Sequence, residues 1–213
     1  MFADRREAGR ALAAALTAYK DDDAVVLALP RGGVPVGYEI ARALGAPLDV
    51  IVVRKLGAPD EPELGLGAVV DGDHPESVLN EEVVEALKIS PEYLDNEIRI
   101  QLREIQRRQQ IYRKGRPAPQ LADRTVIVVD DGIATGGTIR AALRGVRRAR
   151  PARLILAAPV APSEAVQSLR AEADDVVCLE TRADFDAIGQ FYADFRQVSD
   201  DEVVALLERA NAP

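Results

Sequence analysis

The chain contains five short runs of apolar, mostly β-branched residues, at residues 24–29, 48–53, 125–129, 153–158 and, more weakly, 175–179. Apolar and polar residues do not alternate within these runs, which is typical of parallel strands buried on both faces. Segments of helix length lie between several of them, at residues 35–44, 137–149 and 163–171. This order predicts an α/β fold with an open, mainly parallel, doubly wound sheet. Ligands of such sheets bind beyond the carboxyl ends of the strands, so the loops that follow the strands are candidate sites.

Three further segments do not fit this alternation. Residues 55–67 hold two prolines and three glycines directly after a strand, which favours a mobile lid loop. Residues 91–114 predict a long polar helix with one narrow apolar stripe, either solvated or acting as an interface or anion-facing arm. Residues 199–210 predict a C-terminal helix, because Ser199 and Glu202 form a capping box. We expect one domain over residues 1–213, with a small hood at residues 181–213.

Composition excludes several kinds of chemistry. The 213 residues include one cysteine and one histidine, which rules out a disulfide framework, a cysteine-based zinc site and a multi-histidine metal site. We expect Cys178 to be a core residue and His74 a turn residue. The net charge of −8 argues against nucleic-acid or anionic-membrane partners. No targeting signal or membrane span is recognisable, so we expect a cytoplasmic protein.

The strongest chemical signal is V-I-V-V-D-D-G-I-A-T-G-G-T at residues 126–138. A predicted buried strand ends in Asp130 and Asp131, and a Gly/Thr loop then enters a predicted helix. Loop amides and the hydroxyls of Thr135 and Thr138 at a helix N-terminus suit a phosphate. The two carboxylates suit ribose hydroxyls or a metal ion. The stretch lacks the lysine and the spacing of a P-loop. The alternative is a turn in which the aspartate pair only caps a helix. The full order of strand, aspartate pair, Gly/Thr loop and helix is much more specific than an aspartate pair alone, which favours a functional site.

These residues resemble the diphosphosugar-binding motif of the type I phosphoribosyltransferases. Residues 29–35, L-P-R-G-G-V-P, are similar to that family's pyrophosphate loop, and residues 52–59, V-V-R-K-L-G-A-P, resemble the stretch that leads into the hood loop of adenine phosphoribosyltransferases. The three motifs occur in the family's order, and the combination looks most like a group of bacterial phosphoribosyltransferase-like proteins. The resemblance implies a cytoplasmic glycosyltransferase of nucleotide metabolism. It would use 5-phosphoribosyl 1-diphosphate (PRPP), a nitrogenous base and Mg²⁺.

The resemblance also assigns roles to individual residues. It implies that Asp130 and Asp131 hold the ribose hydroxyls and Mg²⁺, the metal directly or through water. The residues that would wrap the 5′-phosphate are Ala134, Thr135, Gly136, Gly137 and Thr138. Those that would bind pyrophosphate are Arg31, Gly32, Gly33, Arg54 and Lys55. Arg31 and Lys55 would be catalytic, because they neutralise the leaving group. An ordinary turn remains the alternative for Arg31, and an extended side chain at a strand end is the alternative for Arg54.

The acceptor is the least readable part of the sequence. Many purine phosphoribosyltransferases carry an aspartate near the base where this chain has Ala134, so the resemblance supplies no general base. Phe185 could stack on a base, or it could pack the C-terminal segment onto the core. We expect a phosphoribosyltransferase with an unidentified nitrogenous acceptor, as a monomer or a homodimer. A non-catalytic PRPP-binding sensor is the alternative, and nucleic-acid binding by residues 99–116 is a weaker third.

Overall fold

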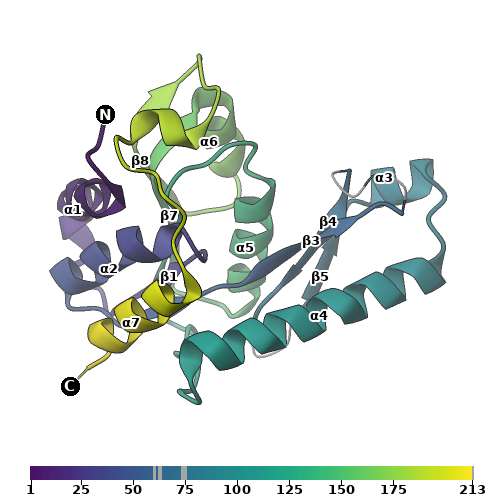
Figure 1. Ribbon diagram of the computed structural model, residues 1–213, viewed down its shortest axis with the longest axis horizontal. Coiled ribbons are helices and arrows are strands. Elements are labelled where there is room, and N and C mark those ends of the chain that lie inside the picture. Colours follow the sequence, from purple (N-terminus) through teal and green to yellow (C-terminus); the bar gives the residue numbers. More distant parts are fainter. Residues whose placement is uncertain (60, 62–63, 73–75, 213) are drawn as a thin grey trace.

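A five-stranded parallel sheet forms the centre of the computed structural model, which describes residues 1–59, 61, 64–72 and 76–212 (Figure 1). Its strands are β1 (Ala24–Ala28), β2 (Leu48–Val50), β6 (Thr125–Val129), β7 (Arg153–Pro162) and β8 (Asp175–Arg182), in the spatial order β2-β1-β6-β7-β8. Each neighbouring pair is parallel. Ala28 pairs with Val129, so β1 and β6 end at the same level of the sheet. The predicted fold class is confirmed.

Helices cover both faces of this sheet (Figure 1). One face packs against α1 (Arg5–Ala15), α2 (Gly33–Leu44) and α7 (Asp200–Ala210), and the other against α5 (Gly137–Arg148) and α6 (Ser163–Leu169). Successive strand residues point to opposite faces: Val26 lies in the first core and Val25 in the second. Both cores need apolar side chains, which explains why the strands read as continuous apolar runs.

A second, antiparallel sheet extends from the core and forms what we call the arm, residues 53–113 (Figure 1). It consists of β3 (Val53–Gly57), β4 (Gly65–Val70) and β5 (Glu76–Leu79), followed by α3 (Glu81–Ala86) and the long helix α4 (Pro91–Arg113). Only Ile105 and Tyr112 of α4 are fully buried, so the predicted narrow apolar stripe is confirmed.

The expected lid loop at residues 55–67 is wrong in part. Its described ends are strand: residues 55–57 belong to β3 and residues 65–67 to β4. The strand was hidden because two consecutive charged residues, Arg54 and Lys55, interrupt its apolar positions and Gly57 ends it. The predicted strand at residues 48–53 likewise splits, because the chain leaves the core sheet after Val50 and enters β3 at Val53.

The N-terminal end of the chain pairs with residues 191–194, the segment before α7. The backbone N–H of Phe2 donates to the carbonyl of Phe191 at 2.8 Å, and that of Ala193 donates back to Phe2 at 2.8 Å. A small aromatic cluster forms there around the turn η2 (Ile188–Phe191); it contains Phe2, Phe185, Phe191, Tyr192 and Phe195. The other short turn, η1 (Thr17–Tyr19), follows α1, and its Tyr19 belongs to the first core. The predicted cap of α7 is present, since the Ser199 hydroxyl accepts the Glu202 N–H at 3.1 Å. Within the described part of the chain, no helix is both long and apolar enough to cross a membrane.

Candidate functional site

The order of the strands defines one crevice at the carboxyl end of the core sheet. After β1 the chain enters α2 on one face, whereas after β6 it enters α5 on the other. We call the place between β1 and β6 the switch point, because neighbouring connections diverge there and leave room for a ligand. Gly32 is the N-cap of α2 and Gly136 is the N-cap of α5. Two helix N-termini, each positively polarised, therefore begin at this crevice.

The loop after β1 packs directly against the turn after β6. A Cβ atom placed on Gly32 would lie 2.0 Å from Oδ2 of Asp131, and one on Gly33 would lie 2.8 Å from the carbonyl oxygen of Val129. Contacts this short leave room only for glycine. The structure therefore brings together the Arg-Gly-Gly and Asp-Asp motifs, which are far apart in the sequence.

Asp130 and Asp131 have different surroundings. Asp130 is half-buried, and its Oδ1 accepts the backbone N–H of Asp131 at 2.9 Å. Burial, and then the neighbouring carboxylate of Asp131, raise the pKa of Asp130 well above its usual range. Asp131 is only 8% exposed. Its Oδ2 accepts Nε of Arg5 at 2.6 Å, and its carbonyl accepts the hydroxyl of Tyr192 at 2.6 Å. Burial raises the pKa of that phenol strongly, so Tyr192 remains a donor.

The loop at residues 134–138 has the features of an anion cradle. Gly136 adopts a left-handed conformation with φ of +79°, which favours glycine, and α5 begins at the next residue. The side chains of Ala134 and Thr135 are exposed, so they do not shield the helix N-terminus. Backbone N–H groups without partners at such a terminus can bind a phosphate.

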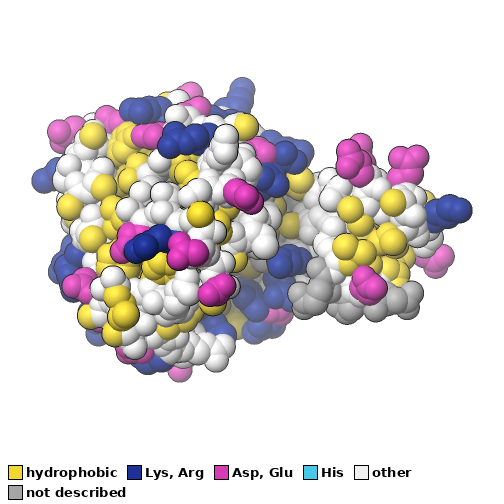
Figure 2. All heavy atoms as spheres, turned by 90° about the horizontal axis from the view of Figure 1, so that it is seen from above, with side chains coloured by type: hydrophobic (Ala, Val, Ile, Leu, Met, Phe, Trp, Pro, Cys, Tyr) yellow, Lys and Arg dark blue, Asp and Glu magenta, His cyan; other side chains and the backbone are white. Residues whose placement is uncertain are grey.

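A cavity of about 960 Å³ links this cradle to the arm. Its wall includes Thr135, Gly137 and Thr138 on the core, and Lys55 with Gly67 on the arm. Arg140 and Arg144 also line it, both paired with Glu172. Figure 2 shows lysine and arginine side chains gathered where the core meets the narrower arm. On the arm side of the cavity, Lys55 is the cationic side chain that faces the cradle, and Glu81 and Glu82 also line the wall there.

The structure does not bring Arg54 to this cavity. Arg54 and Lys55 are consecutive strand residues and point to opposite sides of β3. The Nε of Arg54 donates to Oε1 of Gln101 on α4 at 2.9 Å, so Arg54 holds the arm together. Arg31 lies half-buried in the loop after β1, and the peptide bond that precedes it is cis. Burial raises the pKa of Tyr112 to about 12, and the charge of Arg31 has a smaller, opposite effect on it.

Phe185 is engaged in packing. Its ring stacks on that of Phe191 with centroids 5.1 Å apart, within the aromatic cluster. The structure therefore favours the packing interpretation of this residue. Cys178 packs against the second core, and burial raises the pKa of its thiol to about 11, which agrees with a core role. His74 lies outside the described residues.

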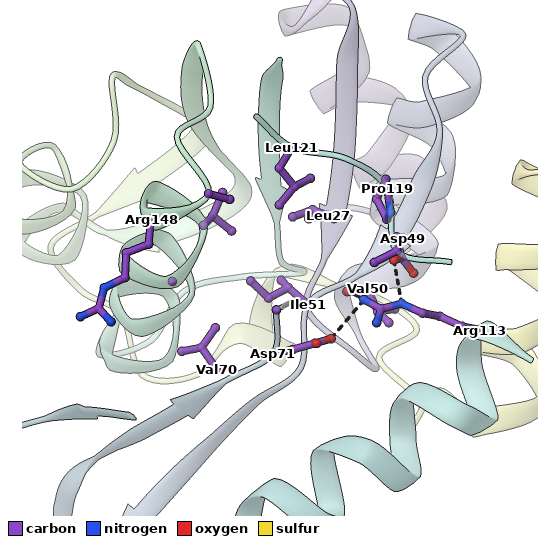
Figure 3. Close-up of a pocket in the computed structure, with 15 residues that line it drawn as sticks. Leu27, Asp49, Val50, Ile51, Val70, Asp71, Arg113, Pro119, Leu121 and Arg148 are labelled. Atoms are coloured by element: carbon purple, nitrogen blue, oxygen red, sulfur yellow. Dashed lines mark hydrogen bonds and ion pairs between the residues drawn. The ribbon is translucent and has the colours of Figure 1, made fainter. Parts of the chain in front are cut away.

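A second polar cluster, which sequence reasoning missed, lies where the arm joins the core (Figure 3). Arg113, the last residue of α4, donates to Asp49 of β2 at 2.8 Å and to Asp71 at 3.2 Å. Gln109 donates to the other oxygen of Asp71. Burial raises the pKa of both carboxyls, and the Arg113 charge opposes that effect. Among the described residues, Oδ1 of Asp49 has no hydrogen-bond partner.

This joint cluster borders a smaller cavity of about 220 Å³ with apolar walls formed by residues such as Leu27, Ile51 and Val70. Gly145, Val146 and Ala149, from the end of α5, also line it. The phosphate cradle lies at the beginning of the same helix, which is about 18 Å long, so the smaller cavity lies toward the other end of α5. No sequence motif could reveal the joint cluster, because its members come from three distant segments.

Comparison with known proteins agrees with this arrangement. A phosphoribosyl transferase domain is recognised over residues 4–196. Proteins from two strains of Mycobacterium tuberculosis, provisionally named phosphoribosyl transferases, are 48% identical over 211 residues, which is 99% of this chain and 47% of theirs. The chain thus spans about half the length of these curated relatives. The crystal structure of TT1426 from Thermus thermophilus superimposes with a TM-score of 0.85 at 44% identity, over 98% of both chains.

Proposed function

The chain belongs to the phosphoribosyl transferase domain family, and from that premise we propose that it transfers ribose 5-phosphate from PRPP to a nitrogenous base and releases pyrophosphate. The observation that carries the proposal is the contact between Gly32 and Asp131 at the switch point. This contact joins the Arg-Gly-Gly loop to the acid pair beside a helix N-terminus. A sugar with a phosphate at one end and a diphosphate at the other matches these three parts.

Each part has a chemical task in this proposal. The backbone N–H groups at residues 134–138 bind the 5′-phosphate at the positive end of α5. Asp130 accepts hydrogen bonds from the ribose hydroxyls, which are donors that a carboxylate can pair with. Arg31 and the amides of Gly32 and Gly33 bind pyrophosphate, and Lys55 approaches from the arm.

The reaction needs charge stabilisation more than proton transfer. When the bond between C1 of ribose and pyrophosphate breaks, negative charge grows on the leaving group and positive charge on the sugar. In this proposal Arg31 and Lys55 neutralise the charge on the leaving group, which is their catalytic role. A site closed to water would strengthen these interactions. Of the lid expected at residues 55–67, only the stretch between β3 and β4 remains a proposal, and residues 60, 62 and 63 of it lie outside the described residues.

The donor set fits Mg²⁺ as a partner of the substrate. Burial and the adjacent carboxylate of Asp131 raise the pKa of Asp130, and a divalent cation nearby would relieve the repulsion between the two carboxylates. Within the described residues, no group of three acidic, histidine or cysteine side chains could hold a metal without a ligand. Mg²⁺ commonly binds one or two carboxylates together with substrate phosphates. When bound, it would neutralise pyrophosphate oxygens, while Asp130, directly or through water, would hold it on the protein side.

A non-catalytic PRPP sensor is the second candidate, and Ala134 favours it. This exposed residue stands where a general base would be expected in many purine enzymes, and it can move no proton. An acceptor that arrives with a free nitrogen lone pair would not need that base. The same PRPP contacts would serve both functions, so only turnover separates them.

One assay series tests the proposal. PRPP binding is measured by calorimetry with and without Mg²⁺, and pyrophosphate release is then followed with a panel of purine, pyrimidine and other nitrogenous acceptors. The proposed enzyme binds PRPP and releases pyrophosphate with at least one acceptor. Binding without release from any acceptor would favour the sensor, and no PRPP binding would overturn both.

We propose that the single domain acts in the cytoplasm, alone or as a homodimer.

A further inference from the structure

Arg5, the first residue of α1, is enclosed by protein although it carries a full charge. Its Nε donates to Asp131 at 2.6 Å and its Nη1 donates to the carbonyl of Arg196 at 2.8 Å. The guanidinium carbon lies 3.9 Å from the centre of the Phe195 ring. Arg5 is 9% exposed. Its donors are therefore directed at the protein, so Arg5 is not placed to bind substrate itself.

The partner of Arg5 is fixed from three directions. Arg5 holds the carboxylate of Asp131, and the Tyr192 hydroxyl holds its carbonyl. On the third side lies Gly32, so close that any side chain there would overlap the Asp131 carboxylate. The carboxylate of Asp131 is thus the surface against which the loop at residues 30–33 packs.

We propose that Arg5 is a positioning residue that holds Asp131 as a brace for the loop at residues 30–33, while Asp130 alone meets the ribose. The family resemblance assigns both aspartates to the sugar, whereas in this proposal Asp131 supports the loop and Asp130 binds the sugar. Without Arg5, two adjacent carboxylates would face each other with no cation between them, and Asp131 would move away from Asp130. Gly32 would then lose its support. The nature of the ligand rests on the proposed function, but the brace itself does not.

The first test compares Arg5→Gln with Arg10→Gln, which changes an exposed arginine of the same helix. Binding of pyrophosphate and of ribose 5-phosphate is measured separately by calorimetry. We expect Arg5→Gln to weaken pyrophosphate binding roughly 10- to 100-fold, the usual effect of removing a group that orients a ligand-binding residue. Ribose 5-phosphate binds the cradle and Asp130, so its affinity should change much less. Arg10→Gln should change neither.

A second test needs no ligand. The N–H groups of Gly33 and Val34 donate to Leu29 and Arg31, so hydrogen exchange reports on the loop. We expect peptides covering residues 30–34 to exchange faster in Arg5→Gln than in the wild type, and to be unchanged in Arg10→Gln. If the wild type binds neither phosphate ligand, the proposed function fails, and loop exchange still decides whether the brace exists.

The Arg5→Lys variant keeps the positive charge at this position. Lysine can reach Asp131 but cannot also donate to Arg196 in the plane of a guanidinium stacked on Phe195. We expect it to restore most of the loop protection and part of the pyrophosphate affinity. Equal weakening of both ligands, or loop exchange identical to the wild type in Arg5→Gln, would overturn the proposal.

Discussion

Two clusters in this protein each contain two aspartates and one arginine, yet they have opposite designs. In the joint cluster, Arg113 contacts both Asp49 and Asp71. At the switch point, Arg5 forms an ion pair with Asp131 only, and Asp130 is left beside a second carboxylate. The joint cluster shares its cation and connects the arm to the core. The switch-point cluster leaves the carboxylate of Asp130 without a cationic partner, directly before the loop that forms the cradle.

The difference shows that a binding site can lower the stability of the folded protein. Asp130 keeps a raised pKa because burial and the neighbouring Asp131 both oppose its negative charge. That imbalance reduces stability, but it leaves acceptor capacity for a ligand. In the joint cluster, by contrast, both carboxylates contact the same arginine, which links the arm to the core. Four predictions test this comparison, from the largest expected effect to the smallest.

Arg113→Met should have the largest effect, because it leaves two buried carboxylates without their cation. Breaking a buried pair in this way costs about 3–5 kcal/mol of unfolding free energy. Urea denaturation followed by circular dichroism measures the loss. Arg103→Met, at an exposed position of the same helix, should change stability by about 0.5 kcal/mol or less. A loss as small as that of the control would show that the cluster does not clamp the arm.

Asp130→Asn, by contrast, should strongly weaken PRPP binding without destabilising the fold. Each hydrogen bond to a charged group is worth about 1.5–3 kcal/mol, so PRPP affinity should fall about 100-fold. The Tm should stay the same or rise, because the repulsion from Asp131 is removed. The double change with Asp131→Asn should abolish binding. Asp201→Asn, at an exposed position, serves as the control. PRPP affinity unchanged from wild type would exclude Asp130 from the site.

Gly32→Ala should moderately lower both the stability of the fold and its affinity for PRPP. The new methyl group would lie 2.0 Å from Asp131 Oδ2, so the loop must shift. Such overpacking costs about 1–3 kcal/mol, and we expect PRPP binding to weaken as the loop moves. Thermal unfolding and calorimetry measure the two effects. Gly65→Ala is the stability control, because a Cβ there meets no atom within 4 Å. Native stability together with native affinity would contradict the observed packing.

The smallest effect concerns the pH dependence of the joint cluster. The pKa values of Asp49 and Asp71 are raised in the folded state by burial, so their contribution favours folding below the usual aspartate pKa, about 4, and fades as pH rises through the raised values. Asp49→Asn should flatten this decline by on the order of 1 kcal/mol, the equivalent of a tenfold change in proton affinity. Denaturation midpoints between about pH 4 and 8 measure it.

Asp174 provides a control of opposite sign. Arg147 lowers the pKa of Asp174, so its stabilising contribution is lost as pH falls through its folded-state pKa. Asp174→Asn should therefore reduce the loss of stability on the acid side and leave the decline at higher pH unchanged. An identical pH profile for Asp49→Asn and wild type would show that the joint carboxyls do not titrate as their burial implies.

Much of the fold could be predicted because its signals are local. Runs such as residues 125–129 read as buried strands without reference to the rest of the chain, and β6 has these same bounds. The arm was less readable. In β3 the consecutive charged residues Arg54 and Lys55 interrupt the apolar pattern, and residues 55–67 hold two prolines and three glycines, so the segment resembled a loop. The helix α1 was not predicted, since residues 5–15 lie before the first apolar run and so outside the alternation of strand and helix segments.

For the candidate site, the sequence by itself determined the residue types and their order along the chain: an Arg-Gly-Gly loop, an acid pair and a Gly/Thr cradle. These are contiguous motifs, and their meaning lies in neighbouring residues. Tertiary structure alone decided that Arg5 pairs with Asp131, that Arg54 faces Gln101 while Lys55 faces the cavity, and that Arg113 joins Asp49 to Asp71. Such pairings depend on which distant segments fold into contact, and charge balance between them exists only after folding.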